Sequence, residues 1–114
     1  MNIDKALIAF SALSQETRLK VFKMLVEYGN TGTPAGALSD RLGIPHNTLS
    51  FHLSHLSHVG LVSFRKEGRQ VIYKANCEMI ESLIGFLSEN CCALEASNGC
   101  AEECSPKPKK GARK

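Results

Sequence analysis

The sequence has no tryptophan, few other aromatic residues and no long apolar run. Its longest apolar stretches, such as residues 6–10, are far shorter than the roughly 20 residues that cross a bilayer. Near the start, Asp4 stands beside Lys5 in place of the basic region of an export signal. We therefore expect a cytoplasmic protein with no membrane partner. The 114 residues, 43% of them hydrophobic, suit one domain with one modest core.

Basic residues are absent from residues 75–104, which carry six glutamates. Residues 41–74 show the opposite balance, with five basic side chains and one acidic side chain. Cationic side chains concentrated in one segment are typical of a surface that binds a phosphate backbone. Residues 105–114 add five more basic residues, but this proline- and lysine-containing stretch is typical of a disordered tail and indicates no binding site.

Cysteine is absent from the first 76 residues, and four of the five cysteines lie within residues 91–104. An odd number of clustered cysteines without an export signal argues against a disulfide framework and favours ligands or redox groups. We interpret Cys77 as a small packing residue. The chain is thus expected to comprise a folded domain over residues 1–90, a cysteine-rich segment over 91–104 and a tail over 105–114. The candidate ligands are Cys91, Cys92, Cys100 and Cys104.

Apolar spacing and capping residues predict four helices, a hairpin and a fifth helix. In the first helix, Ile3, Leu7 and Phe10 fall on one stripe with Ala6 and Leu13. The first helix is expected over residues 3–12, and the second is capped by Ser14 and ends at residues 29–30. The third is capped by Thr33, has Pro34 as its first helical residue and ends at Gly43. The fourth starts near His46, and the fifth starts at Glu78.

The third and fourth helices are separated by a short turn at residues 43–45, a spacing typical of a helix-turn-helix whose second helix enters the major groove. Leu49, Leu53 and Leu56 form the expected buried stripe of this second helix, and Val59 continues it. A hairpin with strands at residues 61–64 and 71–74 follows and would act as a basic wing. We therefore predict a mainly α (α+β) winged helix-turn-helix that binds double-stranded DNA. The candidate contacts are His46, Asn47, Thr48, Ser50, Phe51, His52 and His55 on the helix, with Arg65, Lys66 and Arg69 on the wing.

Three histidines recur every third residue in this helix, at His52, His55 and His58, and their spacing could suggest a metal site. No carboxylate or thiol lies nearby in sequence to complete a ligand set. We interpret these histidines as phosphate contacts and as packing groups at the base of the wing.

Several blocks of the sequence resemble the ArsR/SmtB family of metal-sensing repressors. They are residues 13–19 (LSQETRL), 38–44 (LSDRLGI) and 48–56 (TLSFHLSHL), and the wing block at residues 60–69 (GLVSFRKEGR) with Tyr73 is similar to the wing of that family. The resemblance covers residues 4–90 and implies operator binding in the ligand-free state and release by an inducer. It also implies a homodimer built from the first and last helices. The candidate interface residues are Ile3, Leu7, Phe10, Ile80, Leu83, Ile84 and Leu87.

Two inducer sites of this family have no counterpart here. Residues 33–38 contain no Cys-Val-Cys pair for arsenic, and residues 80–90 contain no histidine or aspartate for zinc. Asn90-Cys91-Cys92 instead resembles members that bind arsenic at a vicinal cysteine pair and a third thiol. The resemblance implies As(III) as inducer, with Cys100 or Cys104 as the third ligand.

Charge separates the candidate ligands of these cysteines. A zinc tetrathiolate carries −2 and would form in a segment with six glutamates, whereas arsenous acid is neutral and leaves a neutral trithiolate. Sulfur ligands also argue against hard cations. The alternatives are a repressor that senses a soft cation such as cadmium or lead, a thiol-redox or reactive-sulfur sensor, a zinc-held interaction module and a small thiol enzyme. An enzyme lacks an evident base near its thiol, so we predict none.

The position of Cys91 suggests how such a site would act. Cys91 continues the stripe of Ile84 and Leu87 by one turn if the last helix extends that far. Binding there would shift the dimer helix and change the spacing of the two recognition helices. Because half-site spacing is geometrically strict, a small shift would weaken operator binding.

Overall fold

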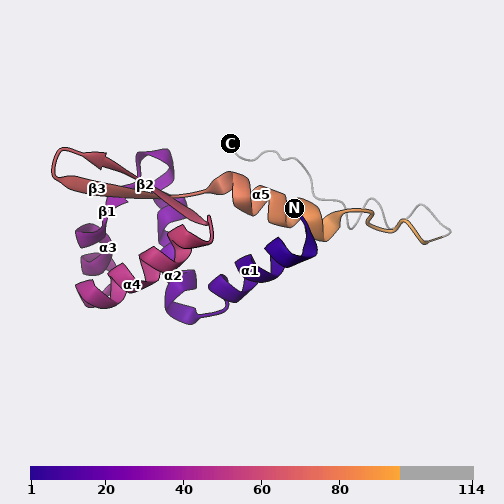
Figure 1. The fold of residues 1–114 in the computed structure, drawn as a ribbon, viewed down its shortest axis with the longest axis horizontal. Helices are drawn as coiled ribbons and strands as arrows, with labels where there is room; N and C mark the ends of the chain where they lie inside the picture. The colour runs from indigo at the N-terminus through magenta and orange to yellow at the C-terminus, as the bar shows by residue number, and fades with distance from the viewer. Residues whose placement is uncertain (96–114) are drawn as a thin grey trace.

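A computed structural model describes residues 1–95 of the chain. Within them, the fold consists of five α-helices and a small antiparallel sheet, which confirms the predicted winged helix-turn-helix. Figure 1 shows α3, α4 and the β2–β3 hairpin at one end, α1 and α5 at the other, and α2 between them. The elements are α1 (Ile3–Leu13), α2 (Glu16–Tyr28), a 3₁₀ turn η1 (Gly29–Thr31), β1 (Thr33–Pro34), α3 (Ala35–Leu42), α4 (His46–His58), β2 (Val62–Glu67), β3 (Gln70–Ala75) and α5 (Cys77–Ser88).

Helix α1 turns its small residues, not its large ones, toward the rest of the chain. Ala6, Ala9 and Ala12 are buried, so the helix approaches its neighbours closely. The predicted stripe is therefore split, because Ala6 faces inward while the large residues face outward. The exposed large residues are Ile3, Leu7, Ile8 and Phe10.

Two capping predictions were wrong by one residue. Ser14 closes α1, and the side chain of Gln15 caps α2 by accepting a hydrogen bond of 2.8 Å from the amide of Arg18. Thr33 and Pro34 form the short strand β1 instead of the first turn of α3. The strand forms because Gly32, with φ of +71°, brings the backbone against Tyr73, where a Cβ atom would lie 2.5 Å from the carbonyl oxygen.

Leucines from α4 form the centre of the core, as their spacing predicted. Leu49, Leu53 and Leu56 are fully buried, together with Leu25 of α2 and Leu38 of α3. Val59 is only half-buried and serves as the C-cap of α4. The polar face of α4 is therefore fixed outward by the packing of its opposite face.

The wing is longer than predicted and belongs to a three-stranded sheet of order β1-β3-β2. β2 pairs with β3 from Val62–Ala75 to Glu67–Gln70, and Gly68 forms the tip with φ of +63°. Of β2, only Val62 is buried, so the strand extends into solvent beyond the core. The hairpin thus stands away from the body of the domain, beside α4 (Figure 1).

Helix α5 begins one residue earlier than expected because Asn76, not a later residue, caps it. Leu83 is buried in the core of its own chain and Ile80 packs against that core, which differs from their expected place in a dimer interface. Ile84 and Leu87 are exposed. Cys77 is exposed as well, so it is not the packing residue that we expected.

Candidate nucleic-acid interface and thiol site

The turn between α3 and α4 has the geometry of a helix-turn-helix. Gly43 adopts the left-handed conformation that ends α3, with φ of +68°, and Pro45 is the extended N-cap of α4. Leu38 and Leu53 are buried in the same core, so the two helices are held at a fixed angle. The N-terminal half of α4 therefore presents a defined surface to solvent.

The outward face of α4 carries polar side chains and no carboxylate. Asn47 accepts a hydrogen bond of 2.9 Å from the amide of Thr48 through its Oδ1 atom, which leaves its amide group as a donor. His55 is half-buried. Of the predicted DNA contacts on this helix, five are exposed: His46, Asn47, Thr48, Ser50 and Phe51.

His52 faces inward, so its predicted contact with DNA is wrong. Its side chain is 8% exposed, and its Nδ1 atom has no hydrogen-bond partner within residues 1–95. Burial lowers the pKa of His52 below its usual value, and the positive charges of Arg18 and His55 lower it further. His52 is therefore a neutral packing residue on the core side of the recognition helix.

The three wing cations are not equivalent. Arg65 donates hydrogen bonds to the carbonyl oxygen of Thr31 at 2.9 Å and to the carboxylate of Glu67 at 2.8 Å. These contacts hold the wing against η1 and use the hydrogen-bond donors of the guanidinium group within the protein. Lys66 and Arg69 are exposed near the tip, so they are the wing cations best placed to reach DNA phosphates.

A groove between α4 and the wing contains candidate contacts that sequence reasoning missed. It has a volume of about 390 Å³ and borders the exposed polar face of α4. The missed residues are Ser54, Ser57 and Tyr73. The signal was present, because Ser50, Ser54 and Ser57 are spaced at i, i+4 and i+7 and therefore share one side of the helix. The groove is lined by Ser50, Leu53, Ser54, Ser57, His58, Phe64 and Tyr73.

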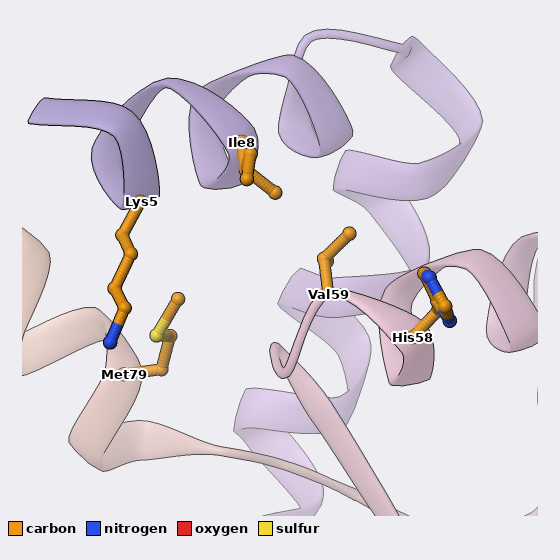
Figure 2. A pocket seen from close by; sticks show the side chains of 5 residues that line it. All are labelled: Lys5, Ile8, His58, Val59 and Met79. Carbon is orange, nitrogen blue, oxygen red and sulfur yellow. The ribbon is translucent and has the colours of Figure 1, made fainter.

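A second hollow lies where three helices meet, and we call it the α1–α5 pocket. It has a volume of about 380 Å³ and is lined by Lys5, Ile8, His58, Val59 and Met79. Figure 2 shows Lys5 extending from α1 toward the start of α5, with Val59 at the end of α4 facing the same space. Side chains of a single chain leave this junction of α1, α4 and α5 incompletely filled.

Cys91 and Cys92 lie beyond the end of α5, not on it. The helix stops at Ser88, and Asn90 and Cys92 have positive φ angles of 60° and 63° in the turns that follow. The expected continuation of the helical stripe to Cys91 is therefore wrong. The turns bring the two Sγ atoms to 3.6 Å from each other, the convergence that a continuous helix would prevent.

The described part of this thiol site is not a complete metal centre, and one of its two cysteines is oxidised. Cys92 is disulfide-bonded, and its contact with the Cys91 sulfur is additional to that bond. Within residues 1–95, no three histidine, cysteine or acidic side chains come together as a metal site. Cys100 and Cys104 lie outside the described residues. Residues 1–95 also contain no helix long and apolar enough to span a bilayer.

Comparison with known proteins agrees with this architecture. Residues 13–63 match a family model described as a helix-turn-helix domain. The chain is 33% identical over 91 residues to the transcriptional activator HlyU of Vibrio cholerae, covering 80% of this chain and 82% of the relative. The structure of reduced HlyU has a TM-score of 0.58 at 30% identity, covering 82% of this chain and 92% of HlyU.

Two further solved structures share the fold. An ArsR-like regulator from Rhodococcus sp. RHA1 has a TM-score of 0.71 at 24% identity and covers 90% of this chain and 93% of its own. A homodimeric winged helix-turn-helix domain from Mycobacterium bovis, described as a possible ArsR-family regulator, has a TM-score of 0.63 at 23% identity, with 84% and 87% coverage. The match to HlyU over most of both chains shows that the chain belongs to the same family of helix-turn-helix transcriptional regulators, and its winged fold is that of structures described as ArsR-like.

Proposed function

We propose that this regulator is an arsenic-responsive repressor. In this proposal a homodimer binds its operator in the absence of ligand, and As(III) bound by Cys91, Cys92 and one of Cys100 or Cys104 releases it and derepresses arsenic-resistance genes. The observation that carries the proposal is the 3.6 Å separation of the Cys91 and Cys92 sulfurs beyond α5. Two sulfurs bonded at about 2.3 Å to one central atom lie about 3.4–3.8 Å apart for bond angles between those of a pyramid and a tetrahedron, so the pair can share an atom with little movement.

The exposed apolar residues of the outer helices support a homodimer. Leu7 of α1 and Leu87 of α5 are 60% and 62% exposed, and Ile3 and Ile84 are similarly open. Monomeric proteins rarely leave contiguous apolar surface of this kind uncovered. The related domain from Mycobacterium bovis is described as homodimeric, which supports the same arrangement here.

Charge favours neutral arsenous acid over a cation bound by four thiolates. Residues 77–95 contain four glutamates and no basic side chain. Arsenous acid exchanges three hydroxyl groups for three thiols, and each exchange forms one As–S bond and releases one water molecule. The product adds no charge to an acidic surface. The reaction requires Cys92 as a thiol, so a dithiol must first reduce its disulfide by transferring two electrons and two protons.

Helix α5 connects the thiol site, which lies beyond its C-terminal end, with the recognition helix α4, which contacts its N-terminal end. Asn76 caps α5 and also donates a hydrogen bond of 2.9 Å from its side chain to the carbonyl oxygen of Gly60, directly after α4. Met79 of α5 and Val59 of α4 line the incompletely filled α1–α5 pocket (Figure 2). A ligand that reorients α5 against its dimer partner would therefore also move the end of α4 and alter half-site spacing.

The test titrates reduced protein, bound to a labelled operator, with arsenite. We expect operator affinity to fall by about 5- to 150-fold, the usual range of coupling between two sites. Cys91→Ser and Cys92→Ser should bind the operator normally and ignore arsenite. Cys77→Ser, which changes a cysteine on α5 outside the site, is the matched control and should respond like wild type. Unchanged affinity of the wild type at saturating arsenite would rule out the proposal.

A thiol-redox sensor is the second candidate, and two observations favour it. Cys92 is disulfide-bonded, and a structure of the relative HlyU is described as reduced, which identifies redox state as a variable in that protein. The same operator assay separates the candidates when peroxide or a dithiol replaces arsenite. Release by peroxide with no response to arsenite would favour the redox sensor, and release by cadmium or lead alone would favour a soft-cation sensor.

A further inference from the structure

Phe51 is a large aromatic residue that is exposed on the recognition helix α4. Its side chain is 67% exposed, whereas the neighbouring residues His52 and Leu53 are buried. Its aromatic contact is an edge-on approach to His52, with ring centroids 5.7 Å apart. An exposed phenylalanine forgoes the stabilisation of about 1.5–3 kcal/mol that burial would give. Its ring is therefore available to a binding partner, and its location on the helix indicates which one.

Phe51 lies on the face of α4 that a helix-turn-helix directs into the major groove. It is the sixth residue of the helix and follows Asn47 by one turn on the same side. Its ring also walls a hollow of about 300 Å³ on the outer surface of α4, together with Ser54, His55 and His58. This hollow has an apolar wall beside hydroxyl and imidazole groups, so it suits the edge of a base.

Unmodified DNA offers one apolar group in the major groove, the C5 methyl group of thymine, which phenylalanine can contact. We infer that Phe51 reads a thymine in each operator half-site by packing against this methyl group. Asn47 is a weaker candidate for selecting an A·T pair, because its Oδ1 atom accepts the Thr48 amide and this hydrogen bond turns the side chain toward the backbone of its own helix. The apolar contact of Phe51 is therefore the selective interaction that we assign to this position.

The test uses the full-length protein and duplexes that it enriches from a random-sequence library, in buffer free of arsenic. Each thymine of the footprinted half-site is replaced in turn by deoxyuridine, which removes the methyl group and keeps every hydrogen-bonding group. We expect one such replacement to weaken wild-type binding by about fourfold, the value of one buried methyl-sized group. Phe51→Ala should bind the thymine and deoxyuridine duplexes equally, and Phe51→Leu should retain part of the preference.

Leu19→Ala is the matched control, because Leu19 is also an exposed large apolar residue, at 43%, but lies on α2 outside the DNA-binding surface. It should keep the wild-type preference for thymine. Indifference of the wild type to every replacement, or a full preference in Phe51→Ala, would overturn the inference. Loss of the dimer in Phe51→Ala, seen by sedimentation, would also overturn it by assigning the ring to a protein contact. These outcomes do not depend on arsenic, so they are independent of the proposed inducer.

Discussion

Apolar residues at helical spacing are buried in one part of this chain and exposed in another. Leu49, Leu53 and Leu56 of α4, the inner stripe, are fully buried among residues of the same chain. The outer stripe, formed by exposed residues of α1 and α5 such as Leu7 and Leu87, is more than half exposed. Both stripes follow the helical repeat, so periodicity alone does not distinguish them. The inner stripe stabilises the single chain, whereas the outer stripe is free to contact a second copy.

The same division separates polar residues on the DNA-binding half. Arg65 is engaged by η1 and Glu67, but Arg69 is exposed at the wing tip. His52 is buried, but His46 at the start of the same helix is exposed. In each pair, one residue holds the fold and the other is available to a partner. Substitution of one member of a pair therefore tests this division.

Truncation of the inner stripe should have the largest effect. Leu53→Ala removes a fully buried side chain, and we expect the free energy of unfolding to fall by about 2–5 kcal/mol. Urea unfolding at several protein concentrations measures this loss. Leu87→Ala is the matched control and should lose much less at low protein concentration, where a dimer contributes little. Equal losses at every concentration would contradict the comparison.

A charge in the outer stripe should separate the subunits without unfolding the chain. Leu7→Glu would bury an unpaired carboxylate in the proposed interface, at a cost of several kcal/mol, so we expect monomers in sedimentation experiments and weak operator binding. Lys23→Glu, an exposed change on α2, should leave the dimer intact. If Leu7→Glu sediments as a dimer, α1 does not form the interface.

Removal of one wing cation should weaken operator binding in a salt-dependent way. Arg69→Ala should reduce the slope of log affinity against log salt concentration by about 1 for each bound subunit, because each wing loses one phosphate contact. Arg65→Ala should change the slope less and should loosen the wing, since its guanidinium group contacts Thr31 and Glu67. Operator titrations at four salt concentrations measure both slopes. A larger slope change for Arg65 would reverse the assignment.

The smallest expected effect concerns His52 and pH. Because the folded state lowers the pKa of His52, the unfolded chain binds this proton more readily. Stability should therefore be complete above the usual value of 6.5 and decline as pH falls through it toward the lower folded pKa. His52→Gln should remove this component, so the difference in unfolding free energy between wild type and variant should change between pH 8 and pH 5.5. A pH-independent difference would show that His52 binds its proton equally in both states.

Much of the fold could be predicted because its signals are local. The turn at Gly43, the leucine spacing in α4 and the glycine at the wing tip each specify a conformation within a few residues. Strand β1 was missed because two residues carry no periodic signal, and its pairing with Tyr73 joins segments far apart in sequence. The sequence pattern also predicted that Phe51 faces away from the buried leucines and that the cysteines are clustered.

The helix-turn-helix, the wing and the clustering of four cysteines within residues 91–104 follow from the sequence alone, because capping, spacing and turn residues act over short range. Tertiary structure alone decided that alanines and not large residues of α1 face inward, that His52 is buried, that Arg65 is engaged by η1, and that the sulfurs of Cys91 and Cys92 converge. The physical reason is that the direction of a side chain depends on what packs opposite it, and these neighbours come from distant parts of the chain or from turns whose φ angles no pattern specifies.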